Sequence, residues 1–177
     1  MSAGIMRNRL LGAPEYTADT FGAKRYELLA TRSRGHSLPV VNGCEQAAGV
    51  GHAALWVEAR ATTRGFLVVM DLTACYPSTA GVGQLLRRIE LRMDQGSLEV
   101  EDQLSSCLGA DLETALLTLA KEGSYQLEPL AGSISGGVET LTFQGHTGNE
   151  EIVWRWKWKA DGRRDDDWQA VGYRILI

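Results

Sequence analysis

The chain has 177 residues, of which 44% are hydrophobic and 23% are charged, a composition typical of one globular domain with a sizeable core. Its net charge of −4 argues against a nucleic-acid partner, because such a surface needs concentrated basic residues. No apolar stretch approaches the roughly 20 residues of a membrane-spanning helix, so we expect no membrane span.

Two features of the sequence bear on its location. The opening stretch MSAGIMRNRLLGAPEY has one basic cluster and too short an apolar run for a signal peptide. Cys44, Cys75 and Cys107 are widely spaced and odd in number, so they predict no disulfide framework and favour a reducing compartment. Together they favour a cytoplasmic location for this chain.

Short apolar runs separated by turn signals indicate an antiparallel β protein, since the chain holds 20 glycines and 4 prolines. The run 38–41 ends at Asn42-Gly43, a favoured pair for a tight turn. The clearest hairpin joins the alternating runs 89–93 and 98–101 across Asp94-Gln95-Gly96. The other apolar or alternating runs are 26–30, 54–59, 65–72, 138–143, 152–159 and 171–177.

Two segments also fit a helix. Asp111 is an N-cap candidate, apolar residues follow it at helical spacing, and Gly123 could end the helix. The stretch 81–90 could likewise begin as a helix. On propensity alone, the segment that starts at Asp111 is predicted to be helical.

The run Trp154–Lys159 alternates three tryptophans with three cations, so a strand there places Trp154, Trp156 and Trp158 on one face and the cations on the other. The tryptophans could form a platform for sugar rings, with the cations beside it. Large aromatic residues more often fill a core, which favours tryptophans facing inward and cations facing water. The choice between core and ligand stays open at this stage.

The remaining polar groups show no catalytic motif. The run Arg163–Asp167 lacks the glycine and alternation of a calcium loop, and we expect it to be solvated. His52 and His146 are expected at or near the surface of loops. Asp71, Asp94 and Asp102 are expected at strand ends or turns. Hydrolase, phosphate-binding and dinucleotide-binding signatures are not found.

One long stretch, EYTADTFGAKRYELLATRSRGHSLPVVNGCEQAAG, resembles part of the heparinase II/III-like polysaccharide lyase family. Four later segments, DLTACYP, RRIELR, EVEDQ and WQAVGYRI, follow in the order of that family. Ser37 stands where the family usually has asparagine. The residues of the long stretch that match the family pattern are Glu15, Tyr16, Thr17, Thr20, Phe21, Arg25, Tyr26, Glu27, Ser33, His36, Pro39, Gly43 and Gln46.

The resemblance implies an all-β fold, an antiparallel two-sheet β-sandwich that spans residues 1–177 as a single domain. It implies that 111–120 is a strand despite its helical spacing. In the family this sandwich follows a helical toroid, which this chain lacks, and the parent protein could be secreted or periplasmic. The toroid and an upstream His-x-His segment supply most catalytic groups, so we expect a C-terminal domain that is not catalytic alone. A stand-alone carbohydrate-binding or interaction module is the alternative.

His36 is the one metal-ligand candidate. In many family members the matching histidine binds zinc together with upstream ligands, so the resemblance implies an inherited zinc ligand whose partners are missing. The residues alone favour a histidine hydrogen-bonded to backbone at a strand edge. The partners that the resemblance implies are an acidic polysaccharide or oligosaccharide and the missing toroid. Because the sandwich face against the toroid would be uncovered, a homo-oligomer is also expected.

Overall fold

The computed structural model describes residues 18–105, 111–119, 125–144, 150–161 and 168–176. The described chain is dominated by two antiparallel sheets that face each other, which confirms the expected all-β sandwich. One sheet has four strands in the order β1-β6-β9-β8, and the other has six in the order β2-β3-β4-β5-β10-β7. No helix among the described residues is long and apolar enough to span a membrane.

The strands follow the alternating runs of the sequence. The four-stranded sheet contains β1 (Val40–Val41), β6 (Leu112–Thr118), β8 (Ser133–Gln144) and β9 (Glu150–Ala160). The six-stranded sheet contains β2 (Leu55–Thr62), β3 (Gly65–Asp71), β4 (Gln84–Arg92), β5 (Ser97–Ser105), β7 (Gln126–Pro129) and β10 (Trp168–Leu176).

Two turns behave as the sequence predicts. The expected hairpin forms between β4 and β5, where Ile89 pairs with Val100 and Leu91 with Leu98. Asn42 and Gly43 have φ angles of 51° and 72°, the left-handed pair that a type I′ turn requires. That turn is held in place because the Asn42 side chain donates to the Ala80 carbonyl at 2.9 Å and accepts the Asp111 N–H at 2.8 Å.

Three local expectations need comment. Residues 112–118 form a strand, so the resemblance was right and the helical spacing misleading; pairing with β9 outweighs local propensity. The stretch 81–90 contributes β4 instead of a helix. The run 26–30 is not a strand either, because it lies in the short 3-10 helices η1 (Ala23–Glu27) and η2 (Leu29–Thr31).

The core between the sheets is aromatic at its centre. Trp158 of β9 is 2% exposed, and its ring stacks on that of Tyr173 of β10 with centroids 4.6 Å apart. Trp156 stacks beside Trp158 and packs against the same core. These two tryptophans therefore fill the core, as their alternation favoured.

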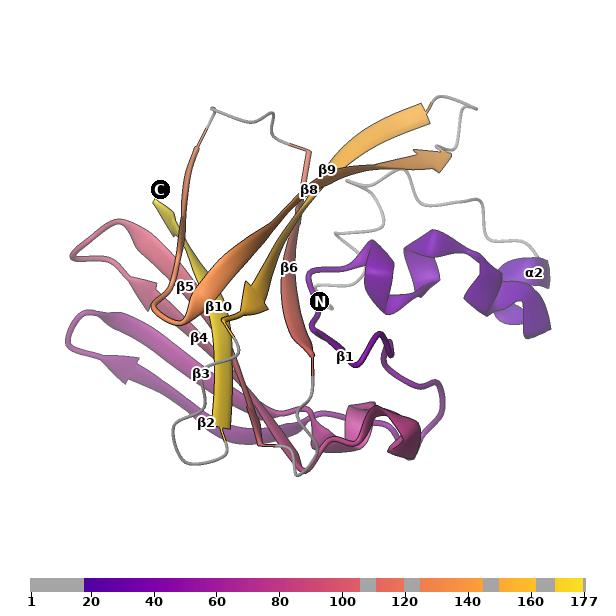
Figure 1. Cartoon of the computed structure of the whole chain (residues 1–177), viewed down its shortest axis with the longest axis horizontal. Helices are drawn as coiled ribbons and strands as arrows, with labels where there is room; N and C mark the ends of the chain where they lie inside the picture. The colour runs from indigo at the N-terminus through magenta and orange to yellow at the C-terminus, as the bar shows by residue number, and fades with distance from the viewer. Residues whose placement is uncertain (1–17, 106–110, 120–124, 145–149, 162–167, 177) are drawn as a thin grey trace.

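The N-terminal turns lie on the outer side of the four-stranded sheet. The helix α2 (Ala18–Phe21) and the 3-10 helices η1, η2 and η3 (Ser33–Gly35) lie across from the six-stranded sheet, beyond β6 (Figure 1). Leu29 and Ala30 pack there against Leu141 and Val153. Two further 3-10 helices, η4 (Thr73–Cys75) and η5 (Ser78–Ala80), connect β3 to β4.

Candidate functional site

The segment around His36 is tied to the sandwich at three points. The Ser37 hydroxyl accepts the Leu117 N–H at 3.0 Å, and the Ser37 carbonyl accepts a bond from the Arg87 guanidinium at 2.6 Å. The Tyr76 hydroxyl donates to the Pro39 carbonyl at 2.6 Å, and its burial raises the pKa of Tyr76. Ser37 therefore anchors this segment to β6.

Arg87 and Asp102 form an ion pair buried between the sheets. Both side chains lie on neighbouring strands at paired positions, and the arginine donates two parallel bonds of 2.7 Å to the carboxylate. A third contact, at 3.2 Å, reaches the Thr114 hydroxyl of β6. Burial alone would lower the pKa of Arg87, but the adjacent Asp102 carboxylate outweighs it and raises the pKa. Asp102 is thus not at a strand end, as the sequence suggested, but in mid-strand.

A pocket of about 600 Å³ lies between the N-terminal turns and the stretch that follows β1. We call it the His36 pocket. It brings together four residues that the family resemblance singles out, Tyr26, Ser33, His36 and Gln46. The full lining is Tyr26, Thr31, Arg32, Ser33, His36, Leu38, Glu45, Gln46, Ala47 and Ala48.

The charges of the His36 pocket are paired. Arg32 forms an ion pair with Glu45, whose carboxylate also accepts the Arg34 N–H at 3.0 Å. Burial alone would raise the pKa of Glu45, but these bonds outweigh it and lower the pKa. The Ser33 hydroxyl accepts the Gln46 N–H at 3.0 Å, which fixes the two sides of the pocket relative to each other.

His36 lies at the wall of this pocket. Its Nε2 is 3.1 Å from the Ala30 carbonyl, so that nitrogen carries the proton and donates, and a metal ion would have to bind Nδ1. Zinc needs about three or four protein ligands. Among the described residues, no group of three or more His, Cys, Asp or Glu side chains could hold a metal ion. The described residues do not fit a complete zinc site, and His36 as a zinc ligand stays a prediction.

The other candidates fall in several places. His52 is exposed, with Nδ1 2.8 Å from the Ala74 carbonyl. Cys44 and Cys75 are free thiols, and burial raises the pKa of Cys75. His146, Cys107 and the run 163–167 lie outside the described residues.

Arg155 corrects the expectation that the cations of β9 face water. It is 4% exposed, and it donates to Glu139 of β8 at 2.9 Å and to Glu113 of β6 at 2.8 Å. Arg34 and Lys157 also contact the Glu139 carboxylate. The outer face of the four-stranded sheet therefore carries a charge network instead of a row of solvated cations.

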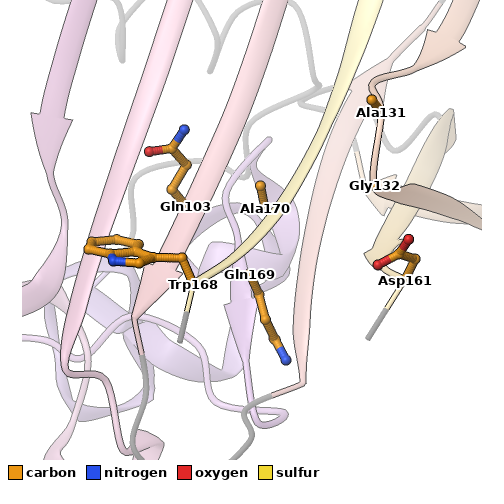
Figure 2. A pocket seen from close by; sticks show the side chains of 7 residues that line it. All are labelled: Gln103, Ala131, Gly132, Asp161, Trp168, Gln169 and Ala170. Atoms are coloured by element: carbon orange, nitrogen blue, oxygen red, sulfur yellow. The ribbon is translucent and has the colours of Figure 1, made fainter. Parts of the chain in front are cut away.

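A second pocket, of about 490 Å³, surrounds the first residues of β10 (Figure 2). We call it the Trp168 pocket. Trp168 and Gln103 lie on one side of β10, while Asp161 and Gly132 lie on the other, and Gln169 extends below the strand. Sequence patterns could not predict this pocket, because its lining comes from four separate parts of the chain: Gln103, Ala131, Gly132, Asp161, Trp168, Gln169 and Ala170.

A third cavity, of about 700 Å³, opens between the two sheets and is lined mainly by apolar side chains. Arg87 lies in its wall, but its charge is already neutralised by Asp102. His52, Gln46, Met70 and Ile175 are among its lining residues.

Comparisons with known proteins identify the fold. No family model and no curated protein matches the chain. Among solved structures, heparan sulfate lyase HepC from Pedobacter heparinus matches with a TM-score of 0.55 at 11% identity, and a mutant of it with 0.54 at 10%. Each match covers 91% of this chain but only 26% and 27% of the lyase. The chain therefore has the fold of about one quarter of a polysaccharide lyase.

Proposed function

We propose that this chain is the C-terminal β-sandwich domain of a polysaccharide lyase that cleaves uronic-acid-containing glycans by β-elimination. The observation that carries the proposal is the fold likeness to heparan sulfate lyase over 91% of this chain. The sequence resemblance to heparinase II/III-like lyases supports it independently, since four of its residues line one pocket. A helical toroid would supply the rest of such an enzyme.

In this proposal, the steps of glycan cleavage are divided between this chain and the helical toroid. Elimination requires a neutralised carboxylate, a base for the proton at C5 and an acid for the leaving oxygen. In the His36 pocket, Arg32 pairs with Glu45 through Nη2, and we propose that its other guanidinium N–H groups bind a substrate carboxylate. Gln46, which also lines the pocket, would bind hydroxyl groups. We assign no catalytic residue in this chain, and propose that it binds acidic glycan while the toroid and the upstream His-x-His segment perform the elimination.

The test measures cleavage and binding separately. We expect no ultraviolet absorbance from unsaturated uronide when the chain alone meets heparan sulfate, and weak but saturable binding of acidic oligosaccharides by calorimetry. Arg32→Ala should weaken that binding about tenfold, as loss of one charged contact predicts. Arg60→Ala, an exposed arginine of β2 outside the pocket, is the matched control. Cleavage by the chain alone, or binding indifferent to Arg32, contradicts the proposal.

A stand-alone carbohydrate-binding module is the second candidate. The Trp156 and Trp158 rings face the core, so the row of tryptophans on β9 does not support it, but the partly exposed Trp168 beside a pocket does. The reading frame of the gene separates the two. A helical sequence upstream that ends in His-x-His supports the lyase domain, whereas a native start at Met1 supports the module.

A further inference from the structure

The Trp168 pocket exists because the sheet edge is only half covered. β7 pairs with β10 from Tyr173 to Leu176, and among the described residues no strand pairs with the first part of β10 on that side. Gly172 is hydrogen-bonded on this side of β10. Its N–H donates to the Ser133 hydroxyl at 2.8 Å, and its carbonyl accepts the Leu130 N–H at 3.0 Å. From Trp168 to Val171, no backbone partner for this edge is found in the part of the chain that the structure describes.

The backbone of Ala170 faces this opening. In an antiparallel ladder, residues two apart direct their N–H and C=O groups to the same side, so Ala170 directs both groups away from β5, as Gly172 does. No partner for them is found in the described part of the chain. Across the gap Gly132 has a φ of +81°, and a Cβ there would lie 3.8 Å from the Ala170 carbonyl oxygen. The pocket thus offers a paired backbone donor and acceptor.

Gln169 adds an unsatisfied group. Its side chain is only 9% exposed and lines the pocket. Its Oε1 is fully buried and accepts no hydrogen bond from the described residues. A buried polar atom without a partner is unfavourable, so a ligand hydroxyl that donates to Oε1 would be favoured there.

The outer side of the pocket carries the indole ring of Trp168 and the side-chain amide of Gln103. Trp168 and Gln103 share the outer face of the six-stranded sheet, because their cross-strand partners are Ser105 and Ala170. Trp168 is 36% exposed, and Figure 2 shows its ring beside Gln103. An indole face next to amide donors and acceptors suits a ring that is apolar on its faces and polar at its rim.

We propose that the Trp168 pocket binds a neutral saccharide. Its volume of about 490 Å³ lies within the range of about 300–1,000 Å³ of small-molecule sites. Its described lining residues include no cationic side chain, so they offer no counter-charge to a uronate or a sulfate. This site is separate from the acidic-glycan function of the His36 pocket and does not depend on it.

A peptide strand fits the same edge less well. Strand addition needs a run of free backbone groups, whereas the open edge here ends at Val171 and Gly132 already lies close to the Ala170 carbonyl. A sugar ring needs only the one donor and acceptor pair.

The experiment is a titration of the ¹⁵N-labelled chain with neutral and with uronic-acid-containing oligosaccharides. We expect saturable shifts of the Ala170 amide and the Trp168 indole signals with neutral sugars. Trp168→Ala should weaken binding at least about tenfold, and Gln103→Ala about threefold. Trp56→Ala is the matched control, because Trp56 is 72% exposed and lies on β2 at the opposite edge of the sheet.

Each other outcome overturns the proposal. These outcomes are no saturable shift with any neutral sugar, tighter binding of an acidic than of a neutral oligosaccharide at Ala170, shifts produced only by an extended peptide, or equal binding by wild type and Trp168→Ala. Should Trp168→Ala fail to fold, Gln103→Ala on the exposed face decides alone. A finding that the His36 pocket does not bind acidic glycan would not change the result at the Trp168 pocket. The two proposals can therefore be rejected independently of each other.

Discussion

Arg87 and Arg155 are both about 4% exposed, yet they are buried in different ways. Arg87 lies between the sheets, and each of its guanidinium nitrogens donates a hydrogen bond, to Asp102, Thr114 or the Ser37 carbonyl. Arg155 lies on the outer face of the four-stranded sheet. Its two partners, Glu113 and Glu139, keep part of their surface in water, and its own Nε has no partner among the described residues.

The comparison shows that two arginines can be equally buried while their carboxylate partners differ in exposure to water. Removing Arg87 would leave the Asp102 carboxylate fully enclosed, whereas removing Arg155 would leave two carboxylates that water can reach. A buried charge that loses its partner is far more costly than an exposed one. The two arginines should therefore differ in their effect on stability.

The largest effect is expected from Arg87→Ala. Because this substitution leaves the buried Asp102 carboxylate without its ion-pair partner, we expect the free energy of unfolding to fall by about 3–5 kcal/mol, measured by urea denaturation. The double variant Arg87→Met with Asp102→Leu should recover most of the loss, since it removes both charges. A loss below about 1 kcal/mol for Arg87→Ala would show that Asp102 finds another partner.

Arg155→Ala should have a smaller effect. It removes charge-assisted bonds to two partly solvated carboxylates, for which we expect a loss of about 2 kcal/mol in the same denaturation experiment. Arg155→Lys keeps the charge but not the forked geometry, and serves as the matched variant. If Arg155→Ala lowered the free energy of unfolding as much as Arg87→Ala, the exposure of the partner carboxylates would not explain the stability effect of either arginine.

Acid should affect the outer network through Glu139. Burial alone would raise the pKa of Glu139, but the bond from Arg155 and the charges of Arg34 and Lys157 lower it below its ordinary value of 4.5. A carboxyl whose pKa is lowered on folding stabilises the fold above its unfolded pKa, and this stabilisation is lost as pH falls through the folded pKa. Denaturation midpoints measured from pH 6 downward should therefore fall less for Glu139→Gln than for wild type. Equal slopes would mean that Glu139 does not stabilise the fold.

The smallest effect on stability is expected at the uncovered part of the six-stranded sheet. The hairpins β2–β3 and β4–β5 extend beyond the four-stranded sheet (Figure 1). Trp56 of β2, Phe66 of β3 and Leu91 of β4 are exposed apolar residues of this sheet. Trp56→Ala should change the free energy of unfolding by less than about 0.5 kcal/mol. It should, however, reduce self-association in sedimentation velocity, because this apolar strip is what a second copy would cover. A wild-type chain that stays monomeric at high concentration contradicts the expected homo-oligomer.

Much of the fold could be predicted from alternation. The β4–β5 hairpin and the Asn42-Gly43 turn follow from short-range pattern and turn chemistry, and Trp158 faces the core as its alternation favoured. The 3-10 turns at 23–31 could not be predicted, because an apolar run of that length fits a strand equally well. Alternation also assigned Arg155 to a face but could not reveal that the N-terminal turns and two carboxylates enclose that face.

The candidate site was predictable only where a local motif carried it. His36 and Gln46 are close in sequence and were singled out together. The Arg87–Asp102 pair depends on the register of two strands, and Asp102 was assigned to a strand end for lack of that register. The Trp168 pocket depends on where β7 stops pairing, a topological fact that no short stretch of sequence contains.

The double anchoring of Ser37 has a consequence for the proposed binding of glycan. Its hydroxyl is held by β6 and its carbonyl by the Arg87 guanidinium, so the wall of the neighbouring pocket is braced by the centre of the sandwich. In the proposed role, a sugar that binds there would meet a surface that is already organised, and little loop ordering would oppose its binding.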